Sequence, residues 1–209
     1  LNGVAFHDSR CAATDGTVLA RMDFEGEQGT LSPFVIPVPA ARLLNALRRD
    51  GEVKVMREDP HTPRLRWELE GAVVELREPF SFSEFPAYAR VLPKYPPACV
   101  LEVDRNALRE ALDRCRLVSK QVLMTLKSEG VLHLESKDYE GGRVDEDIAC
   151  TYTAIRGGWQ GPIGVDPAYL LQAVNHMPRK GRIEVRGPLA PILIDIEGGL
   201  AVVMPVRLD

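Results

Sequence analysis

The sequence predicts an α+β fold built from a repeated βαβββ unit, and three observations support this prediction. A ten-residue pattern occurs three times, as VPAARLLNAL from Val38, VDRNALREAL from Val103 and VDPAYLLQAV from Val165. A short alternating apolar stretch, typical of a strand, precedes each copy. Short β-rich segments separated by turn residues follow each copy.

Each copy of the pattern begins a predicted helix. Asp104 and Asp166 stand where an N-cap is needed, because an aspartate side chain accepts hydrogen bonds from the free amide groups of a first helical turn. Apolar residues then recur three and four positions apart, which is typical of a helix with one buried face. The residues predicted to form these faces are Leu43, Ala46 and Leu47, then Leu108, Ala111 and Leu112, then Leu170, Ala173 and Val174.

The remaining periodic segments are predicted strands, because they are short, rich in β-branched residues and bounded by turn residues. The strands before the three helices are predicted at 34–38, 100–103 and 163–165. Those after them are predicted at 52–57, 63–69 and 71–77, at 122–127, 130–136 and 146–153, and at 182–186, 191–197 and 200–206. Residues 1–30 contribute only strands, at 4–7, 11–14 and 17–23, and so correspond to the end of a further unit.

A segment rich in proline and aromatic residues, 79–97, has neither helical nor strand periodicity. We place a domain boundary within it, near 93–97. Two units amount to about 125 residues, an ordinary domain size. The prediction is a partial domain with its connector at 1–95 and a complete domain at 96–209. Because the sequence begins with Leu1 rather than Met, we expect it to be a fragment or a processed chain.

The composition excludes several classes of protein. With 45% apolar and 27% charged residues among 209, the chain is expected to be soluble and globular rather than disordered. It has no run of ~20 apolar residues and no basic-then-apolar leader, so no membrane association is expected. Four scattered cysteines match no close zinc-ligand spacing and no CxxC pair, which favours a reducing, cytoplasmic location.

The net charge of −4 conceals an uneven distribution of charge. The helical segments with their flanks, 39–50, 104–120 and 166–182, each hold two more basic than acidic residues, so the rest of the chain carries −10. Four basic residues of the second segment fall within about 60° of one another on a helix and predict a basic stripe that can hold phosphates. They are Arg105, Arg109, Arg116 and Lys120. Basic residues near a helix C-terminus also complement its dipole, but the same bias in three repeats favours a function.

Three further motifs resemble one protein family. They are FPAYARVLP at 85–93, ATDG at 13–16 followed by Leu19 and Ala20, and the ending VMPVRL at 203–208. In this order and at about these spacings they resemble the bacterial replicative sliding clamp, the β subunit of DNA polymerase III. The resemblance extends over the whole chain, from the back of the clamp's middle domain through its last domain.

The resemblance implies a DNA-clamp fold, in which each domain packs two helices on antiparallel sheets. It also implies a processivity factor that, at full length, forms a homodimeric ring around double-stranded DNA, with the helices lining the hole. Such binding is electrostatic and independent of sequence, which permits sliding. The implied DNA-binding residues are Arg42, Arg48, Arg49, Arg105, Arg109, Arg116, Lys120, Arg179 and Lys180.

The resemblance further implies a hydrophobic peptide-binding pocket between the last two domains. Its partners would be the DNA polymerase III α subunit, the clamp loader and other proteins with a clamp-binding motif. Apolar walls with a flexible methionine suit varied peptide side chains. The implied residues are Leu1, Thr14, Gly16, Leu19, Pro86, Arg90, Val91, Tyr169, Leu189, Pro191, Met204, Pro205, Val206 and Arg207. The plain alternative is that Leu19, Val91 and Val206 are ordinary core residues.

Ring closure is the third implied property. Leu117 and Val118 match apolar positions on the ring-closing surface, although the plain alternative makes them the end of a buried helical turn. Because the family closes its ring through a first domain that this sequence lacks, we expect the chain alone to be an open monomer or a nonstandard assembly. Departures from the family at 17–18, at 120–122 and at Asp209 leave the shape of the pocket and its peptide preference open.

An enzyme and a peptide-binding hub are the alternative functions. Acidic residues near 138–147 could bind a metal, but Gly141 and Gly142 in their middle favour an acidic hairpin tip. These residues are Asp138, Glu140, Asp145, Glu146 and Asp147. Neither a phosphate-binding glycine loop nor a nucleophile with a nearby base is evident, so we expect a non-catalytic accessory subunit without cofactor or metal. The hub would keep the clamp fold and its peptide site without encircling DNA.

Overall fold

The computed structural model describes residues 3–7, 9–23, 34–46, 53–59, 62–69, 72–76, 87–128 and 130–208. The chain divides into two compact units, one formed by Leu1–Ala13 with Asp23–Pro86 and the other by Thr14–Met22 with Ala87–Asp209. This division groups residues by contact. It does not test the predicted domains 1–95 and 96–209, which stay a prediction.

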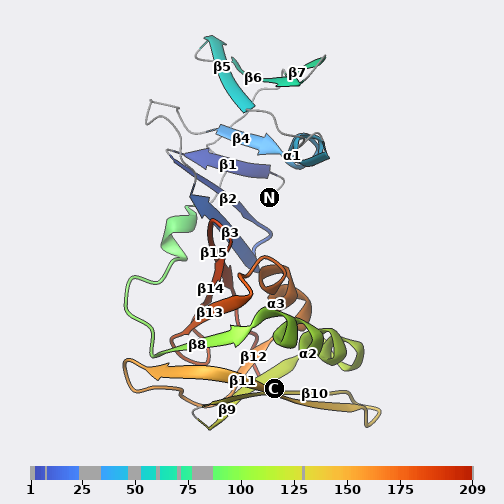
Figure 1. Ribbon diagram of the computed structural model, residues 1–209, viewed down its shortest axis with the longest axis vertical. Helices are drawn as coiled ribbons and strands as arrows, with labels where there is room; N and C mark the ends of the chain where they lie inside the picture. Colours follow the sequence, from blue (N-terminus) through green and yellow to red (C-terminus); the bar gives the residue numbers. More distant parts are fainter. Residues whose placement is uncertain are drawn as a thin grey trace. The chain divides into compact units, whose positions relative to one another are not determined.

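The described residues of the first unit form two antiparallel sheets and one helix (Figure 1). One sheet has the order β2 (Arg10–Thr14), β1 (Gly3–His7), β4 (Phe34–Pro37), and the rings of Phe6 and Phe34 stack across it with centroids 5.0 Å apart. The helix α1 (Val38–Ala46) follows β4 directly and packs on β1 and β4. The other sheet has the order β5 (Val53–Asp59), β6 (Thr62–Leu69), β7 (Ala72–Leu76).

The predicted buried face of α1 is wrong for the residues that can be assessed. Leu43 is 42% exposed and Ala46 is also exposed, whereas Ala40 is buried. Leu47 lies outside the described residues. The helix α1 contacts β1 and β4, and in its first turn Ala40 is buried while Pro39 is exposed. The helical periodicity indicates an apolar face, but it does not determine whether another element covers that face.

The second unit contains two complete βαβββ repeats and one strand from near the N-terminus. The first repeat consists of β8 (Cys99–Asp104), α2 (Arg105–Val118), β9 (Val122–Ser128), β10 (Val131–Lys137) and β11 (Arg143–Ala154). The second consists of β12 (Ile163–Val165), α3 (Pro167–Val174), β13 (Lys180–Val185), β14 (Ile192–Ile196) and β15 (Gly199–Val203). A single 3₁₀ turn, η1 (Tyr88–Arg90), precedes them, and β3 (Val18–Asp23) pairs with β15.

The two repeats are joined by exchange of their first strands. The strand order in this unit is β12-β9-β10-β11-β8-β13-β14-β15-β3, with antiparallel pairing throughout. The strand β12 therefore lies beside β9 of the preceding repeat, and β8 lies between β11 of its own repeat and β13 of the next. Neither repeat can complete its sheet alone, so the unit is expected to fold as one.

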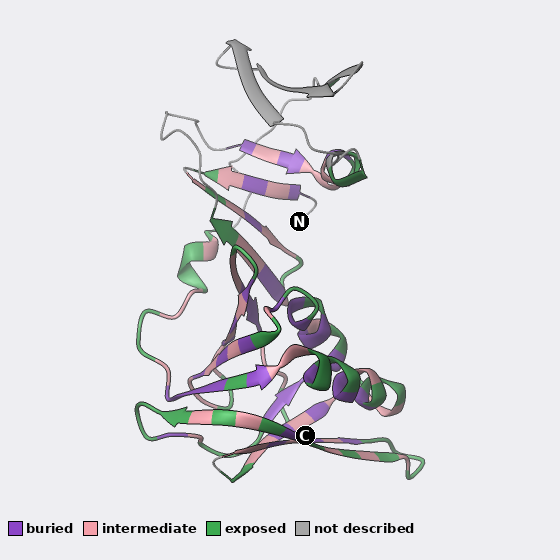
Figure 2. Cartoon of the chain, in the orientation of Figure 1, coloured by how far each residue is buried: buried purple, intermediate pink, exposed green. Residues whose placement is uncertain are grey.

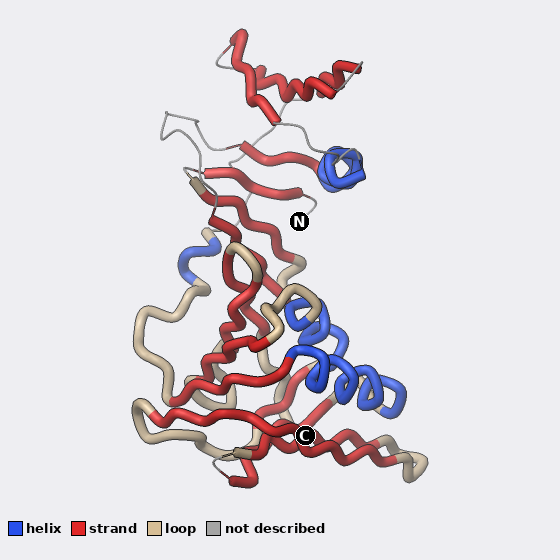
Figure 3. Tube along the Cα trace, in the orientation of Figure 1, coloured by secondary structure: helices blue, strands red, loops and turns tan. Residues whose placement is uncertain are grey.

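The helices α2 and α3 pack against each other and cover the sheet (Figures 1 and 3). Their predicted buried faces are confirmed, because Leu108, Leu112, Leu170 and Val174 have no exposed surface and neighbouring alanines are also buried. Figure 2 shows the two ribbons alternating between buried and exposed residues, as an amphipathic helix requires. The core between helices and sheet includes Leu101, Met124, Leu132, Leu134, Ile183 and Ile194.

Both predicted N-caps are present. The Oδ1 atom of Asp104 accepts hydrogen bonds from the amide groups of Asn106 at 2.9 Å and Ala107 at 3.0 Å. Asp166 accepts one from the amide of Ala168 at 2.8 Å, ahead of Pro167 at the first helical position. These bonds satisfy amide groups that a helix start leaves free, which is why both helices begin where the sequence predicts.

Several predicted boundaries are wrong by a few residues. The strand β11 runs over 143–154 rather than 146–153, and β15 ends at Val203 instead of continuing to 206. Among the described residues beyond β15, Val206 forms an isolated β-bridge with Gly164. All four cysteines are free. In the part of the chain that the structure describes, no helix is long and apolar enough to cross a membrane.

Candidate functional site

The solvent-facing side of α2 carries basic residues with different degrees of pairing. Arg109 is exposed and forms no ion pair with any described residue, and Arg116 pairs only with Asp113 of its own helix, at 3.0 Å. Arg105 is half-buried, because its Nη1 donates to the carbonyl of Met177 at 3.0 Å. It also lies 4.0 Å from Glu197. Arg109 and Arg116 thus have the positive charge most available to an external anion.

The fourth predicted member of the stripe does not belong to the helix. The helix α2 ends at Val118, and Ser119 has extended backbone angles of −148° and 157°, so Lys120 lies two residues beyond the last turn. The assumption that helical geometry continues to residue 120 was therefore wrong. Lys120 is exposed, and its role in binding stays a prediction.

Arg114 has a different environment from its neighbours on α2. Its Nε donates to Oε1 of Glu146 on β11 at 2.5 Å, and its Nη2 donates to Oε2 at 3.0 Å. The bond from Arg114 to Glu146 also raises the pKa of the guanidinium. A bidentate arginine-carboxylate pair of this kind fixes the side chain toward the sheet. Arg114 is therefore a structural link between helix and sheet.

The basic residues predicted at the end of the third helix lie past it. The helix α3 stops at Val174, and Pro178 disfavours helical backbone at Met177. Lys180 is therefore the first residue of β13, and Arg179 directly precedes the strand. Both are exposed, and Arg179 lies 3.9 Å from Asp104 at the N-terminus of α2. Arg42 is exposed on α1, while Arg48 and Arg49 lie outside the described residues.

The ATDG motif forms the tight turn before β3. The Oδ1 atom of Asp15 accepts hydrogen bonds from the amides of Thr17 and Val18, both at 2.8 Å, and the hydroxyl of Thr14 donates to the carbonyl of Val18 at 2.8 Å. Gly16 has a φ of 96°, a left-handed conformation that glycine adopts without strain. The turn leads directly into Leu19, which is buried and pairs with Val202.

The second unit brings this turn beside the chain's ending. The amide of Met204 donates to the carbonyl of Thr17 at 3.1 Å, and that of Val206 donates to the carbonyl of Gly164 at 2.8 Å. The carbonyl of Arg207 accepts a hydrogen bond from Nε2 of Gln121 at 2.9 Å. Two motifs almost two hundred residues apart in the sequence are therefore adjacent in space.

The other predicted peptide-binding residues are dispersed over the same unit. Leu189 is 68% exposed in the turn before β14, Pro191 and Tyr169 are half-buried, and Arg90 and Val91 are exposed at η1. Within the part that the structure describes, no hydrogen bond joins these five to the Thr14 turn or to Met204–Arg207. Leu1 and Pro86 lie outside the described residues.

The end of α2 presents an apolar side chain to solvent. Leu117 is 82% exposed and Val118 is half-buried. The alternative that Leu117 ends a buried turn is therefore wrong, because its side chain points away from the core formed by Leu112 and Cys115.

The acidic segment is a hairpin, as predicted, but its acidic residues do not all lie at the tip. The turn spans 138–142, where Asp138 Oδ1 accepts hydrogen bonds from the amides of Glu140 and Gly142. Asp145 and Asp147 belong to β11 instead. Hydrogen bonds from Arg143 to Asp145 and from Lys127 to Asp147 hold the pKa of each carboxyl below its ordinary value.

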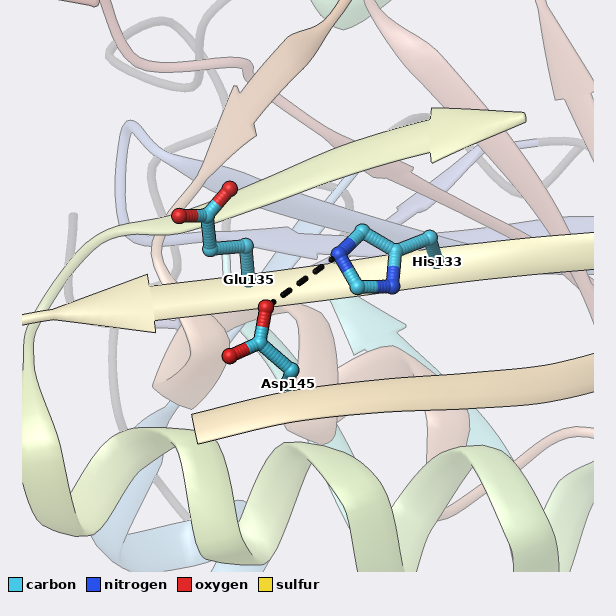
Figure 4. A group of neighbouring side chains, drawn as sticks. All are labelled: His133, Glu135 and Asp145. Atoms are coloured by element: carbon cyan, nitrogen blue, oxygen red, sulfur yellow. Dashed lines mark ion pairs between the residues drawn. The ribbon is translucent and has the colours of Figure 1, made fainter. Parts of the chain in front are cut away.

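The hairpin also gathers a side-chain group that sequence reasoning missed. His133 and Glu135 on β10 lie opposite Asp147 and Asp145 on β11. Figure 4 shows the imidazole of His133 with the carboxylates of Glu135 and Asp145 beside it. The alternation of His133 and Glu135 along one strand was the available signal, but the predicted start of the partner strand at 146 left Asp145 out.

The comparison with protein families identifies this unit. A profile described as "DNA polymerase III beta subunit, C-terminal domain" matches residues 89–204. The chain belongs to this family. The matched segment begins in η1 and ends one residue past β15, so it includes both complete repeats.

Solved sliding clamps have a similar fold. The chain is 26% identical to the DNA polymerase III β subunit of Thermotoga maritima, with a TM-score of 0.84 over 100% of this chain and 58% of that one. The clamp of Bartonella birtlesii bound to griselimycin is 28% identical, with a TM-score of 0.81 over 99% of this chain and 58% of that one. The clamp of Pseudomonas aeruginosa bound to griselimycin is 26% identical, with a TM-score of 0.82 over 99% of this chain and 57% of that one.

The chain spans a little under three fifths of the length of these three clamps. A search of curated protein sequences found no match. The DNA-clamp fold predicted from the repeat and the three motifs is confirmed by the family match and the solved structures.

Proposed function

We propose that this protein acts as a sliding clamp, in which α2 and α3 face duplex DNA and the protein tethers DNA polymerase III and other clamp-binding proteins. The observation that carries the proposal is the family match over residues 89–204. The free cationic groups of α2 support it, since Arg109 and Arg116 are exposed and uncommitted to the sheet. Phosphate neutralisation by such groups gives affinity without sequence preference.

The DNA role is tested by reversing the exposed charges of α2. In the full-length protein, the triple variant Arg105→Glu, Arg109→Glu, Arg116→Glu should lose loading on primed circular DNA while still binding peptide. The charge-matched comparison is between the single variants Arg109→Glu and Arg156→Glu, because Arg156 is exposed on a loop outside the helices and its reversal should leave loading intact. Unchanged loading of the triple variant would favour the alternative, a clamp-fold peptide hub that does not encircle DNA.

We propose that short hydrophobic peptides from the α subunit, the clamp loader and other partners bind beside the Thr14 turn and the chain's ending. The adjacency of Thr17 and Met204 supports this site, because it places Met204, Pro205 and Val206 next to a tight turn. Leu189 supports it as an exposed apolar side chain on the same unit. Flexible methionine and proline walls accept peptide side chains of different shape.

The peptide site is tested by measuring the affinity of a fluorescent hydrophobic pentapeptide. Met204→Ala and Leu189→Ala should each weaken binding about tenfold, which corresponds to the loss of one anchoring contact. Ile155→Ala is the matched control, because Ile155 is also an exposed aliphatic residue but lies on the loop after β11. If Met204→Ala and Leu189→Ala bind the peptide as tightly as the control Ile155→Ala does, the site is not where we propose.

We further propose that Leu117 and Val118 contribute to ring closure in the full-length homodimer. An aliphatic side chain that is 82% exposed at a helix end suits a surface covered by another subunit. Leu117→Glu should shift the full-length protein from dimer toward monomer in analytical ultracentrifugation. An unchanged dimer would place the closing contact elsewhere.

A further inference from the structure

The face of the β10–β11 hairpin opposite the Arg114–Glu146 pair carries a histidine between carboxylates. Register places His133 across from Asp147 and Glu135 across from Asp145. The candidate ligand atoms of His133, Glu135 and Asp145 all lie within 4.8 Å of one another (Figure 4). Because side chains on one face of a sheet alternate by two residues, His133 and Glu135 both project toward the same side as their partners.

The orientation of the imidazole is fixed by a fourth residue. The Nδ1 atom of His133 lies 2.7 Å from Oδ1 of Asp147, which also accepts a hydrogen bond from Lys127 at 2.9 Å. A carboxylate only accepts, so Nδ1 carries a hydrogen and donates it. This assignment leaves Nε2 as the atom that faces Asp145, at 3.5 Å from Oδ1.

The contact between Nε2 and Asp145 requires a positive charge on Nε2, which either a proton or a metal ion supplies. If Nε2 is unprotonated, its lone pair meets the lone pairs of an ionised carboxylate, and the two repel. A metal ion bound to Nε2 and to the carboxylates converts this repulsion into coordination. Histidine ligands in metal sites commonly donate their other ring N–H to a carboxylate, as His133 does to Asp147.

Glu135 completes the set with a shielded oxygen. Its Oε1 is buried from solvent, and among the described residues its ion-pair partners are Lys137 and Arg143, the latter at 3.6 Å. His133 is also shielded, with 12% of its side chain exposed. A divalent ion here would replace one of these cations as the neutralising charge for Glu135.

We propose that Nε2 of His133 and the carboxylates of Glu135 and Asp145 bind one divalent transition-metal ion of the Zn²⁺ type, with Asp147 as the residue that positions the imidazole. An imidazole nitrogen with two carboxylate oxygens suits Zn²⁺ better than Mg²⁺ or Ca²⁺, which prefer oxygen ligands alone. Zn²⁺ holds its ligand atoms roughly 3–4 Å apart, so rotations of the Glu135 and Asp145 side chains suffice to close the site.

The test is a titration of the 209-residue chain with Zn²⁺ by calorimetry, and with Co²⁺ by visible absorption. We expect one ion per chain and at least tenfold weaker binding in His133→Gln and in the nearly isosteric Asp145→Asn. Asp147→Ala should weaken binding 10- to 100-fold, the range for loss of a group that orients a ligand. His176→Gln, an exposed histidine outside the hairpin, should bind as the wild type does.

Lys137→Met separates a metal site from a structural charge cluster. Removing the Lys137 ammonium should tighten Zn²⁺ binding several-fold, because it no longer competes with the metal ion for the carboxylate of Glu135. Wild-type affinity that is no greater than that of His133→Gln would overturn the proposal. Weaker binding in Lys137→Met, or thiolate charge-transfer bands in the Co²⁺ spectrum that assign the ion to cysteine, would also overturn it.

Discussion

Arg114 on α2 is held by Glu146 on β11 through two parallel hydrogen bonds, whereas Arg109, five residues earlier on the same helix, has no ion-pair partner among the described residues. The two arginines have the same charge and stand on the same element. Because of their different surroundings, Arg114 attaches the helix to its sheet, whereas Arg109 is available to solvent and to external anions.

This difference predicts unequal effects on DNA binding. Arg109→Ala should reduce the slope of log affinity against log salt for duplex DNA by about 0.9, because one phosphate contact is lost. Arg114→Ala removes the same charge from the same helix and should leave the slope unchanged. Fluorescence anisotropy of the chain with a labelled duplex, from low to moderate salt, gives both slopes. Equal changes in the two variants would contradict the assignment.

A second prediction concerns the two faces of α2. Leu112 has no exposed surface, so Leu112→Ala should lower the free energy of unfolding by about 2–5 kcal/mol through lost burial and a cavity. Leu117 is 82% exposed, so Leu117→Ala should change it by no more than about 0.5 kcal/mol. Urea denaturation followed by circular dichroism measures both. A large effect at Leu117 would mean that its side chain is covered in the isolated chain.

A third prediction concerns the attachment of the chain's ending. A Cβ atom at Gly164 would lie 2.8 Å from the carbonyl oxygen of Val206 and 2.7 Å from a methyl carbon of Leu208. Gly164→Ala should therefore displace 204–208, lower stability by about 1–3 kcal/mol and weaken peptide binding. At Gly130 the nearest atom is 3.7 Å away, so Gly130→Ala should preserve peptide affinity. If Gly164→Ala binds the peptide as tightly as the wild type does, the peptide site does not depend on the position of 204–208.

The fourth prediction is a pH dependence at the start of α2. Hydrogen bonds from the amides of Ala107 and Asn106, with lesser contributions from Arg179 and Arg105, hold the pKa of Asp104 below its ordinary value. Its contribution to stability is therefore complete above the unfolded-state pKa of about 3.9 and is lost as pH falls through the lower folded-state value.

Asp104→Asn provides the matched comparison, because asparagine accepts the same amide hydrogen bonds but does not titrate. From pH 7 to pH 3, the melting temperature of the wild type should fall further than that of Asp104→Asn, as measured by differential scanning calorimetry. Other carboxyl groups titrate equally in both proteins, so their effects cancel in the difference. Parallel melting curves over this range would show that the charge of Asp104 adds nothing to the cap.

Much of the fold could be predicted from the sequence, because local patterns carry local information. The N-caps Asp104 and Asp166 and the spacing of Leu108, Ala111 and Leu112 determine where the helices begin and which side they bury. The order of strands and helices in each repeat was correct for the same reason. The candidate site was predictable only as a set of residue types, from the repeat and from the family resemblance.

The tertiary structure decided what depends on pairing across the chain. The packing of α2 on β11 gives Arg114 a carboxylate partner that Arg109 lacks. Pairing between distant segments joins Thr17 to Met204 and brings Asp145 beside His133. The tertiary structure also leaves Leu43 exposed on a helix whose periodicity predicts a buried face. The physical reason is that periodicity reports only which side of an element is apolar. Which segment covers that side, and which charges meet there, is settled by long-range packing that no local pattern encodes.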